Sequence, residues 1–164
     1  MYPLERFLAA SQLKSADYVQ PAPFITGHFM LWFAGIPEDR ASEYWGRDYK
    51  KKLYAQLKTI RAFKSLPDVM IWPGVWADFG PAVETSALGC NIIFTKRSSP
   101  FPQPVVRKVD DIDRMRVPDP EKDGFMPLGL EAYSYMAKKV PRRLEKQYGY
   151  GQWTHALGPS DIAG

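Results

Sequence analysis

Three residues whose side chains often move protons in enzymes lie within or directly after apolar runs of the sequence. His28 closes one such run, Asp78 follows a second, and His155 lies inside a third. An imidazole is a general acid or base near neutral pH, and a carboxylic acid among aromatic rings donates a proton or holds a cationic group. The competing interpretation is packing for the two histidines and a turn for Asp78, which precedes Gly80. We take these three residues as candidate catalytic residues.

Aromatic and hydroxyl side chains beside these positions offer surfaces for a ligand. Indole and phenyl rings stack on flat apolar molecules, whereas a serine or aspartate after a strand either hydrogen-bonds a ligand or caps a helix. The candidate substrate-binding residues are therefore Trp32, Phe33, Trp72, Trp76, Ser160 and Asp161.

The only cysteine is Cys90, at the start of an apolar run, where we expect it to pack in the core. With two histidines and no CxxC or HExxH spacing, the chain does not predict a complete zinc site of its own. One cysteine cannot form an internal disulfide, which fits a reducing cytoplasm. The first residues do not resemble a secretory signal, and no window of about 18 apolar residues predicts a membrane span.

Composition and charge favour an ordinary globular domain. Of the 164 residues, 45% are apolar and 24% are charged, and the net charge is +4. The basic clusters at 50–52, 138–139 and 142–143 fall in predicted helices, so we expect solvated helix faces and no nucleic-acid partner.

Short apolar runs alternate with helical patterns along the whole chain. This alternation favours parallel βαβ units and an α/β fold without a linker that would divide residues 1–164. We also expect a hairpin between residues 92–97 and the VVRKV segment. The predicted strands are 21–29, 69–73, 90–94 and 152–158, and the predicted helices are 3–14, 47–66, 81–88 and 127–146, the last interrupted at Pro141.

Four phrases in this order resemble the uroporphyrinogen decarboxylase superfamily. They are LERFLAA near the start, VETSALGCNIIF, the stretch VDDIDRMRVPDPEKDGFMPLGLEAY, and GPSDIAG at the end. The most specific part is the proline, aspartate and glycine order of 118–127. The resemblance implies a TIM-like (β/α)₈ barrel with its site at the carboxyl ends of the strands.

The superfamily contains a cofactor-free tetrapyrrole decarboxylase and zinc-dependent methyltransferases that exchange methyl groups with a corrinoid protein. The decarboxylase carries arginines after its first strand, whereas this chain has MLWFAGIPE at 30–38 and keeps only Ala34 and Gly35 of that pattern. Its loop aspartate is also matched by Asp78 only with a two-residue shift. The resemblance therefore implies the methyltransferase branch, with a methoxy-aromatic or methylamine-like donor, or a thiol or pterin, as the small-molecule substrate. The zinc ligands of that branch belong to the second half of the barrel.

A (β/α)₈ barrel takes roughly 250 residues, so we expect 1–164 to be its N-terminal half. Two other interpretations stay open. One is a tetrapyrrole decarboxylase of the same fold, and the other is a non-catalytic half-barrel subunit that pairs with a second chain or with another copy of itself.

Overall fold

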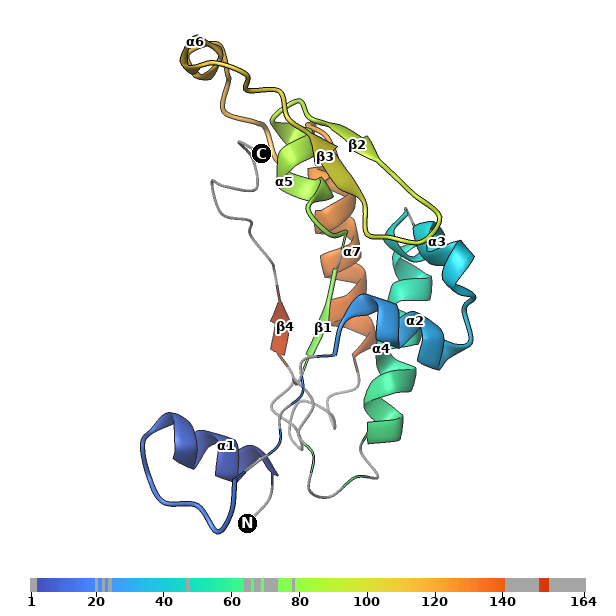
Figure 1. The fold of residues 1–164 in the computed structure, drawn as a ribbon, viewed down its shortest axis with the longest axis vertical. Coiled ribbons are helices and arrows are strands. Elements are labelled where there is room, and N and C mark those ends of the chain that lie inside the picture. Colours follow the sequence, from blue (N-terminus) through green and yellow to red (C-terminus); the bar gives the residue numbers. More distant parts are fainter. Residues whose placement is uncertain are drawn as a thin grey trace.

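The computed structural model describes residues 3–19, 21, 23, 25–46, 48–63, 66, 69, 74–77, 79–140 and 151–153. Its elements form an elongated body with α1 at one end and α6 at the other (Figure 1). In order along the chain they are α1 (Pro3–Ser11), α2 (Gly27–Ala34), the 3₁₀ turn η1 (Glu38–Arg40), α3 (Ala41–Trp45), α4 (Tyr49–Phe63), β1 (Gly74–Trp76), α5 (Ala82–Ala87), β2 (Asn91–Ile93), β3 (Phe101–Gln103), α6 (Val109–Ile112), α7 (Met126–Lys139) and β4 (Gly151–Trp153).

Two small sheets of opposite type organise the fold. β1 pairs with β4 in parallel, with Val75 opposite Gln152, and β2 pairs with β3 in an antiparallel hairpin, with Ile92 opposite Pro102. The parallel pair agrees with the βαβ alternation of the sequence, and the architecture is α/β-like with a small sheet. Residues 70–73 and 154–158, which complete two of the predicted strands, lie outside the described residues.

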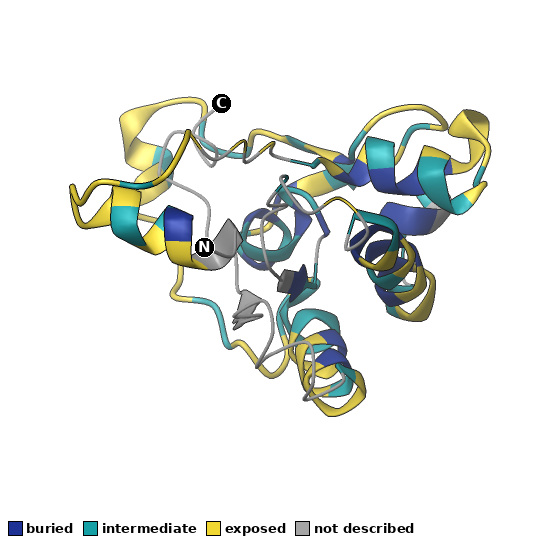
Figure 2. Cartoon of the chain, turned by 90° about the horizontal axis from the view of Figure 1, so that it is seen from below, coloured by how far each residue is buried: buried dark blue, intermediate teal, exposed yellow. Residues whose placement is uncertain are grey.

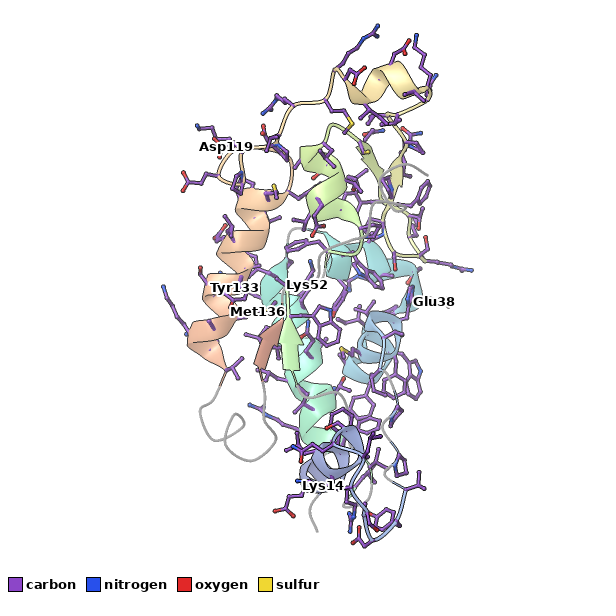
Figure 3. The ribbon with its side chains drawn as sticks, turned by 90° about the vertical axis from the view of Figure 1, so that its left-hand side faces the viewer. Lys14, Glu38, Lys52, Asp119, Tyr133 and Met136 are labelled. Carbon is purple, nitrogen blue, oxygen red and sulfur yellow. The ribbon has the colours of Figure 1, made fainter. Side chains whose placement is uncertain are left out.

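The two long helices α4 and α7 pack together beside β1. Leu53, Ile60, Val75 and Met136 form the buried centre of this contact. Buried residues lie on the sides of the helices that face the rest of the fold (Figure 2), and Met136 lies in the interior (Figure 3). At the edge of the contact, Tyr49 donates a 2.7 Å hydrogen bond to the carboxylate of Glu131.

The expectation of a strand at 21–29 is wrong, because none of its described residues lies in a strand and α2 begins at Gly27. Gly35 ends this helix with φ at +80°, and its N–H and that of Ile36 bond back to Trp32 and Leu31. This is a Schellman-type termination. An apolar segment of eight residues without clear periodicity suits a helix as well as a strand.

The predicted strand at 90–94 exists as β2, which is only partly buried and is the first strand of an antiparallel hairpin. Asn91 is exposed, while Ile92 and Ile93 are half-buried. Its partner is 101–103 rather than the VVRKV segment. The connection after Ile93 has only seven residues before Phe101, and a parallel crossover needs a dozen or more. Pro102 is tolerated because both strands of a two-stranded hairpin are edge strands.

The helix predictions hold more closely. α1, α4 and α5 fall within the predicted segments, and α7 ends at Lys139, just before Pro141. Gly89 follows α5 with φ at +96°, as expected for a glycine that terminates a helix. Cys90 is buried, as predicted from its apolar surroundings.

Candidate functional site

His28 lies in the first turn of α2, where it faces the turn of the β2–β3 hairpin. Its ring packs against Trp45, with 4.6 Å between the ring centroids, and its Nε2 lies 3.2 Å from the backbone oxygen of Arg97. The N–H of Ala41 bonds to the carbonyl of Lys96 at 3.2 Å. His28 is exposed, and it helps to hold the hairpin turn against α2 and α3.

The carboxyl end of β1 is anchored by a side chain of α4. Gln56 donates from Nε2 to the carbonyl of Trp76 and accepts the N–H of the same residue at Oε1, both at 2.8 Å. Gln56 is fully buried, and its Nε2 also lies 3.4 Å from the hydroxyl of Tyr44. An amide that makes two bonds to one backbone unit imitates a neighbouring strand. The direction in which the chain leaves β1 is thereby fixed by α4.

Lys52 is a buried cation on the same face of α4, one turn before Gln56. It is completely inaccessible, and its ammonium lies 3.0 Å from the centroid of the Phe79 ring. It lies in the interior (Figure 3). The negative face of an aromatic ring attracts a cation, most strongly without water. The expectation that the cluster at 50–52 is a solvated helix face is therefore wrong for Lys52, although Lys50 and Lys51 are exposed.

Trp32 and Phe33 belong to a different group of side chains. Phe29 stacks with Phe33 at an interplanar angle of 15° and packs edge-on against Phe63 at the end of α4. Trp32 lies beside Phe29 with 72% of its surface exposed. These rings form an aromatic patch between α2 and α4, apart from the contacts of His28.

Two candidate residues thus come to one region and two to another. His28 rests on Trp45, and Trp76, the last residue of β1, packs against the buried cluster that contains Trp45, so the two candidates share this neighbour. Trp32 and Phe33 join the aromatic patch. The remaining candidates lie outside the described residues: Trp72, Asp78, His155, Ser160 and Asp161.

Sequence reasoning missed Lys52 and Gln56. A signal was available, because Lys52, Gln56 and Thr59 follow a spacing of four and three residues, the period of one helix face. Leu53 and Ile60 are adjacent to that face. A polar stripe in register with the apolar stripe of a helix marks buried polar side chains rather than solvated ones.

The described residues do not offer a ligand set for the zinc that the sequence resemblance implies. No three histidine, cysteine or carboxylate side chains gather in the described part of the chain, and we derive no step through zinc. Among the described helices, none is long and apolar enough to cross a membrane.

Comparison with known proteins leaves the family of this chain open. No family model, curated protein or solved structure matches it.

Proposed function

We propose that the chain is the N-terminal part of a uroporphyrinogen-decarboxylase-like barrel that belongs to a corrinoid-linked methyltransferase. The supporting structural observation is the parallel pair of β1 and β4, because α5, the hairpin and α7 intervene between these strands. A strand, a helical crossover and a parallel neighbour form the repeating unit of such barrels. The order of sequence phrases described above supports the same assignment.

The segment after the predicted first strand favours methyl transfer over tetrapyrrole decarboxylation. No arginine or lysine occurs from Gly27 to Asp39, so this segment lacks the cations that grip propionate groups. It supplies instead Trp32, Phe33 and the imidazole of His28. Although the structure places Trp32 and Phe33 in a patch apart from His28, uncharged aromatic side chains suit an uncharged methoxy-aromatic ring better than a propionate.

The residues of this chain would bind and orient the donor. Trp76, anchored by Gln56, gives an apolar wall at the carboxyl end of β1, and His28 gives a hydrogen-bonding group at the start of α2. In the proposal, Asp78 supplies a proton to the oxygen from which the methyl group departs. The corrinoid of a partner protein would be the methyl acceptor.

A methyl-transfer assay tests this function. The full-length protein is incubated with its corrinoid partner and a series of methoxy-aromatic and methylamine donors, and methylation of the corrinoid is followed by absorbance. We expect turnover with at least one donor and a loss of more than tenfold for Asp78→Asn. Conversion of uroporphyrinogen to coproporphyrinogen, without methyl transfer from any donor, would assign the decarboxylase activity instead.

A further inference from the structure

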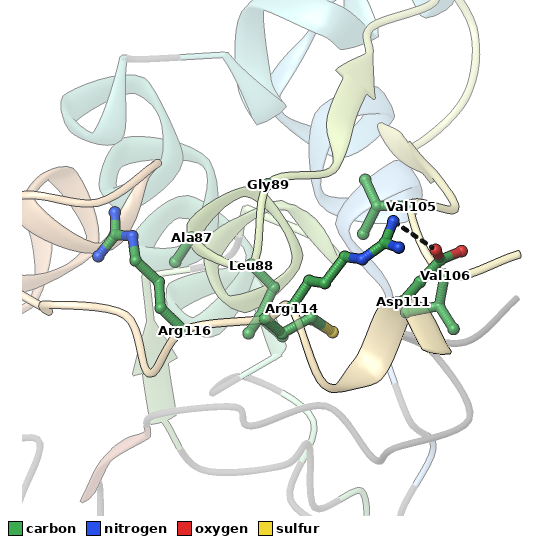
Figure 4. Close-up of a pocket in the computed structure, with 9 residues that line it drawn as sticks. Ala87, Leu88, Gly89, Val105, Val106, Asp111, Arg114 and Arg116 are labelled. Atoms are coloured by element: carbon green, nitrogen blue, oxygen red, sulfur yellow. Dashed lines mark ion pairs between the residues drawn. The ribbon is translucent and has the colours of Figure 1, made fainter. Parts of the chain in front are cut away.

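A groove crosses the α6 end of the molecule, away from the candidate site. It consists of two adjoining open hollows of about 460 and 670 Å³ that share Gly89 and Val105. Its walls are the end of α5 and the chain on either side of α6 (Figure 4). The lining residues of the first hollow include Ala87, Leu88, Val105, Val106, Met115 and the charged residues Asp111, Arg114 and Arg116.

The charged groups of the lining are mostly positive. Arg107, Arg114 and Arg116 border the groove, against the single carboxylate of Asp111. Arg116 is held in place by two hydrogen bonds to Asp123, at 2.7 and 2.5 Å, which keep the pKa of the Asp123 carboxyl below its usual value. The guanidinium of Arg116 is therefore held at the edge of the groove by Asp123.

The other two arginines have side chains that can turn to a ligand. Arg114 contacts Asp111 only at 3.9 Å, and its side chain is 73% exposed. An exposed pair of this kind contributes little, so exchanging Asp111 for another carboxylate costs little. Asp111 is already occupied in part, since its Oδ2 accepts the backbone N–H groups of Arg107 and Lys108. The side chain of Arg107 makes no ion pair within the described part of the chain.

The floor of the groove also offers backbone groups. Val105 and Val106 are half-buried, lie outside the strands, and donate no backbone hydrogen bond to any described residue. An extended peptide pairs with such N–H groups and places alternate side chains on an apolar floor. An open, shallow groove is suited to a peptide, whereas small molecules prefer enclosed pockets that bury most of their surface.

We propose that this groove binds an extended acidic segment of a partner protein, with carboxylates on Arg107 and Arg114 and apolar side chains on Leu88 and Val106. The partner is thus recognised by alternation of acidic and apolar residues. This interaction is independent of the proposed methyl transfer.

Fluorescence anisotropy with a labelled hexapeptide of alternating glutamate and valine tests the proposal on the full chain. We expect binding that weakens with salt, because the charges are exposed. Arg107→Gln and Arg114→Gln should each weaken it roughly threefold and together roughly tenfold, the range of exposed ion pairs. Lys14→Gln is the matched control, since it removes one exposed positive charge beyond α1, at the other end of the molecule, and should leave binding unchanged.

A second variant, at Val106, tests whether the apolar floor of the groove contributes to binding. Val106→Glu should abolish binding, because it places a carboxylate where the peptide packs an apolar side chain and because that negative charge repels the acidic peptide. Circular dichroism should show an unchanged fold. The proposal is overturned if the peptide does not bind at millimolar concentration, or if the arginine variants bind it as well as the control does. Equal binding of a lysine–valine peptide or of a uridine hexanucleotide would also overturn it, since the groove would then not select acidic peptides.

Discussion

Replacement of Gly124 by alanine is the sharpest test of how closely the turn before α7 packs against the end of α5. Gly124 has φ at +54°, in the left-handed region, and its backbone lies directly against the end of α5. A Cβ atom there would meet the hydroxyl oxygen of Ser86 and would lie 2.5 Å from the backbone nitrogen of Ala87. The Ser86 hydroxyl is also bonded locally, because it accepts the N–H of Phe125 at 2.8 Å and donates to the carbonyl of Val83 at 3.0 Å.

The expected loss of stability in Gly124→Ala has two parts. A non-glycine residue in the left-handed conformation costs about 1–2 kcal/mol. Crowding against backbone atoms that cannot rotate away costs about 1–3 kcal/mol more. We therefore expect Gly124→Ala to lower the free energy of unfolding by about 2–5 kcal/mol, and the melting temperature by roughly 5–15 °C for a domain of this size.

Two other glycines separate these contributions. Gly35 also has positive φ, at +80°, but a Cβ would meet nothing within 4 Å, so Gly35→Ala should cost only about 1–2 kcal/mol. Gly129 lies inside α7, where a Cβ would be 3.5 Å from a methyl group of Val83, an ordinary contact. Gly129→Ala should stabilise the helix by about 0.5–1 kcal/mol.

Chemical denaturation of the three variants, followed by circular dichroism, measures these differences. The reasoning requires the order Gly129→Ala above wild type, then Gly35→Ala, then Gly124→Ala. If Gly124→Ala and Gly35→Ala lose the same stability within about 0.5 kcal/mol, the close approach of the turn to α5 contributes nothing and the argument fails.

Three further predictions concern other parts of the fold. The Arg6 guanidinium beside Asp17 lowers the pKa of that carboxyl from 3.8 to about 2, so the pair stabilises the fold above about pH 4 and loses this effect as the pH falls toward 2. Asp17→Asn should flatten the pH dependence of the denaturation midpoint between about pH 4 and pH 2. An unchanged pH dependence would refute the role of this pair. Gln56→Leu should cost about 2–6 kcal/mol in urea denaturation, because it leaves two backbone groups of Trp76 without a partner at about 1–3 kcal/mol each. A loss below about 1 kcal/mol would show that another group replaces the amide. Met136→Ala should cost about 2–5 kcal/mol in the same assay, as its side chain is fully buried between α4 and β1, and a near-neutral result would contradict this packing.

The long helices were predictable because apolar residues recur in them at helical spacing over many residues. Leu53, Leu57 and Ile60 repeat at helical spacing over about two turns of α4, a spacing that no strand accommodates. α7 ends at Lys139, before Pro141. The parallel relation of β1 and β4 was likewise predictable from the alternation of short apolar runs and helices. Nothing in that alternation determines which residues form the ladder.

The start of α2 was mispredicted for a reason visible in the sequence. Residues 27–34 contain no β-branched side chain, which lowers their preference for a strand, and Gly35 follows as a helix terminator. Pro21 and Pro23 favour an extended backbone, but the described residues 21, 23, 25 and 26 form no strand.

Only part of the candidate site could be predicted from the sequence. Histidine and aspartate indicate chemistry by their type, whereas a residue that positions others can be of any polar type. Trp76 and Phe79 flank the loop that carries Asp78, and both are held from α4: Trp76 through the amide of Gln56 and Phe79 through the ammonium of Lys52. Residues four apart lie on one helix face, so a single rigid helix supports both ends of the loop. A buried lysine and a buried glutamine are expensive to desolvate, and surface-type patterning alone does not place them in a core. In this chain Gln56 holds the backbone of Trp76 and Lys52 holds the ring of Phe79, so α4 is the element that sets the position of the residues on either side of Asp78.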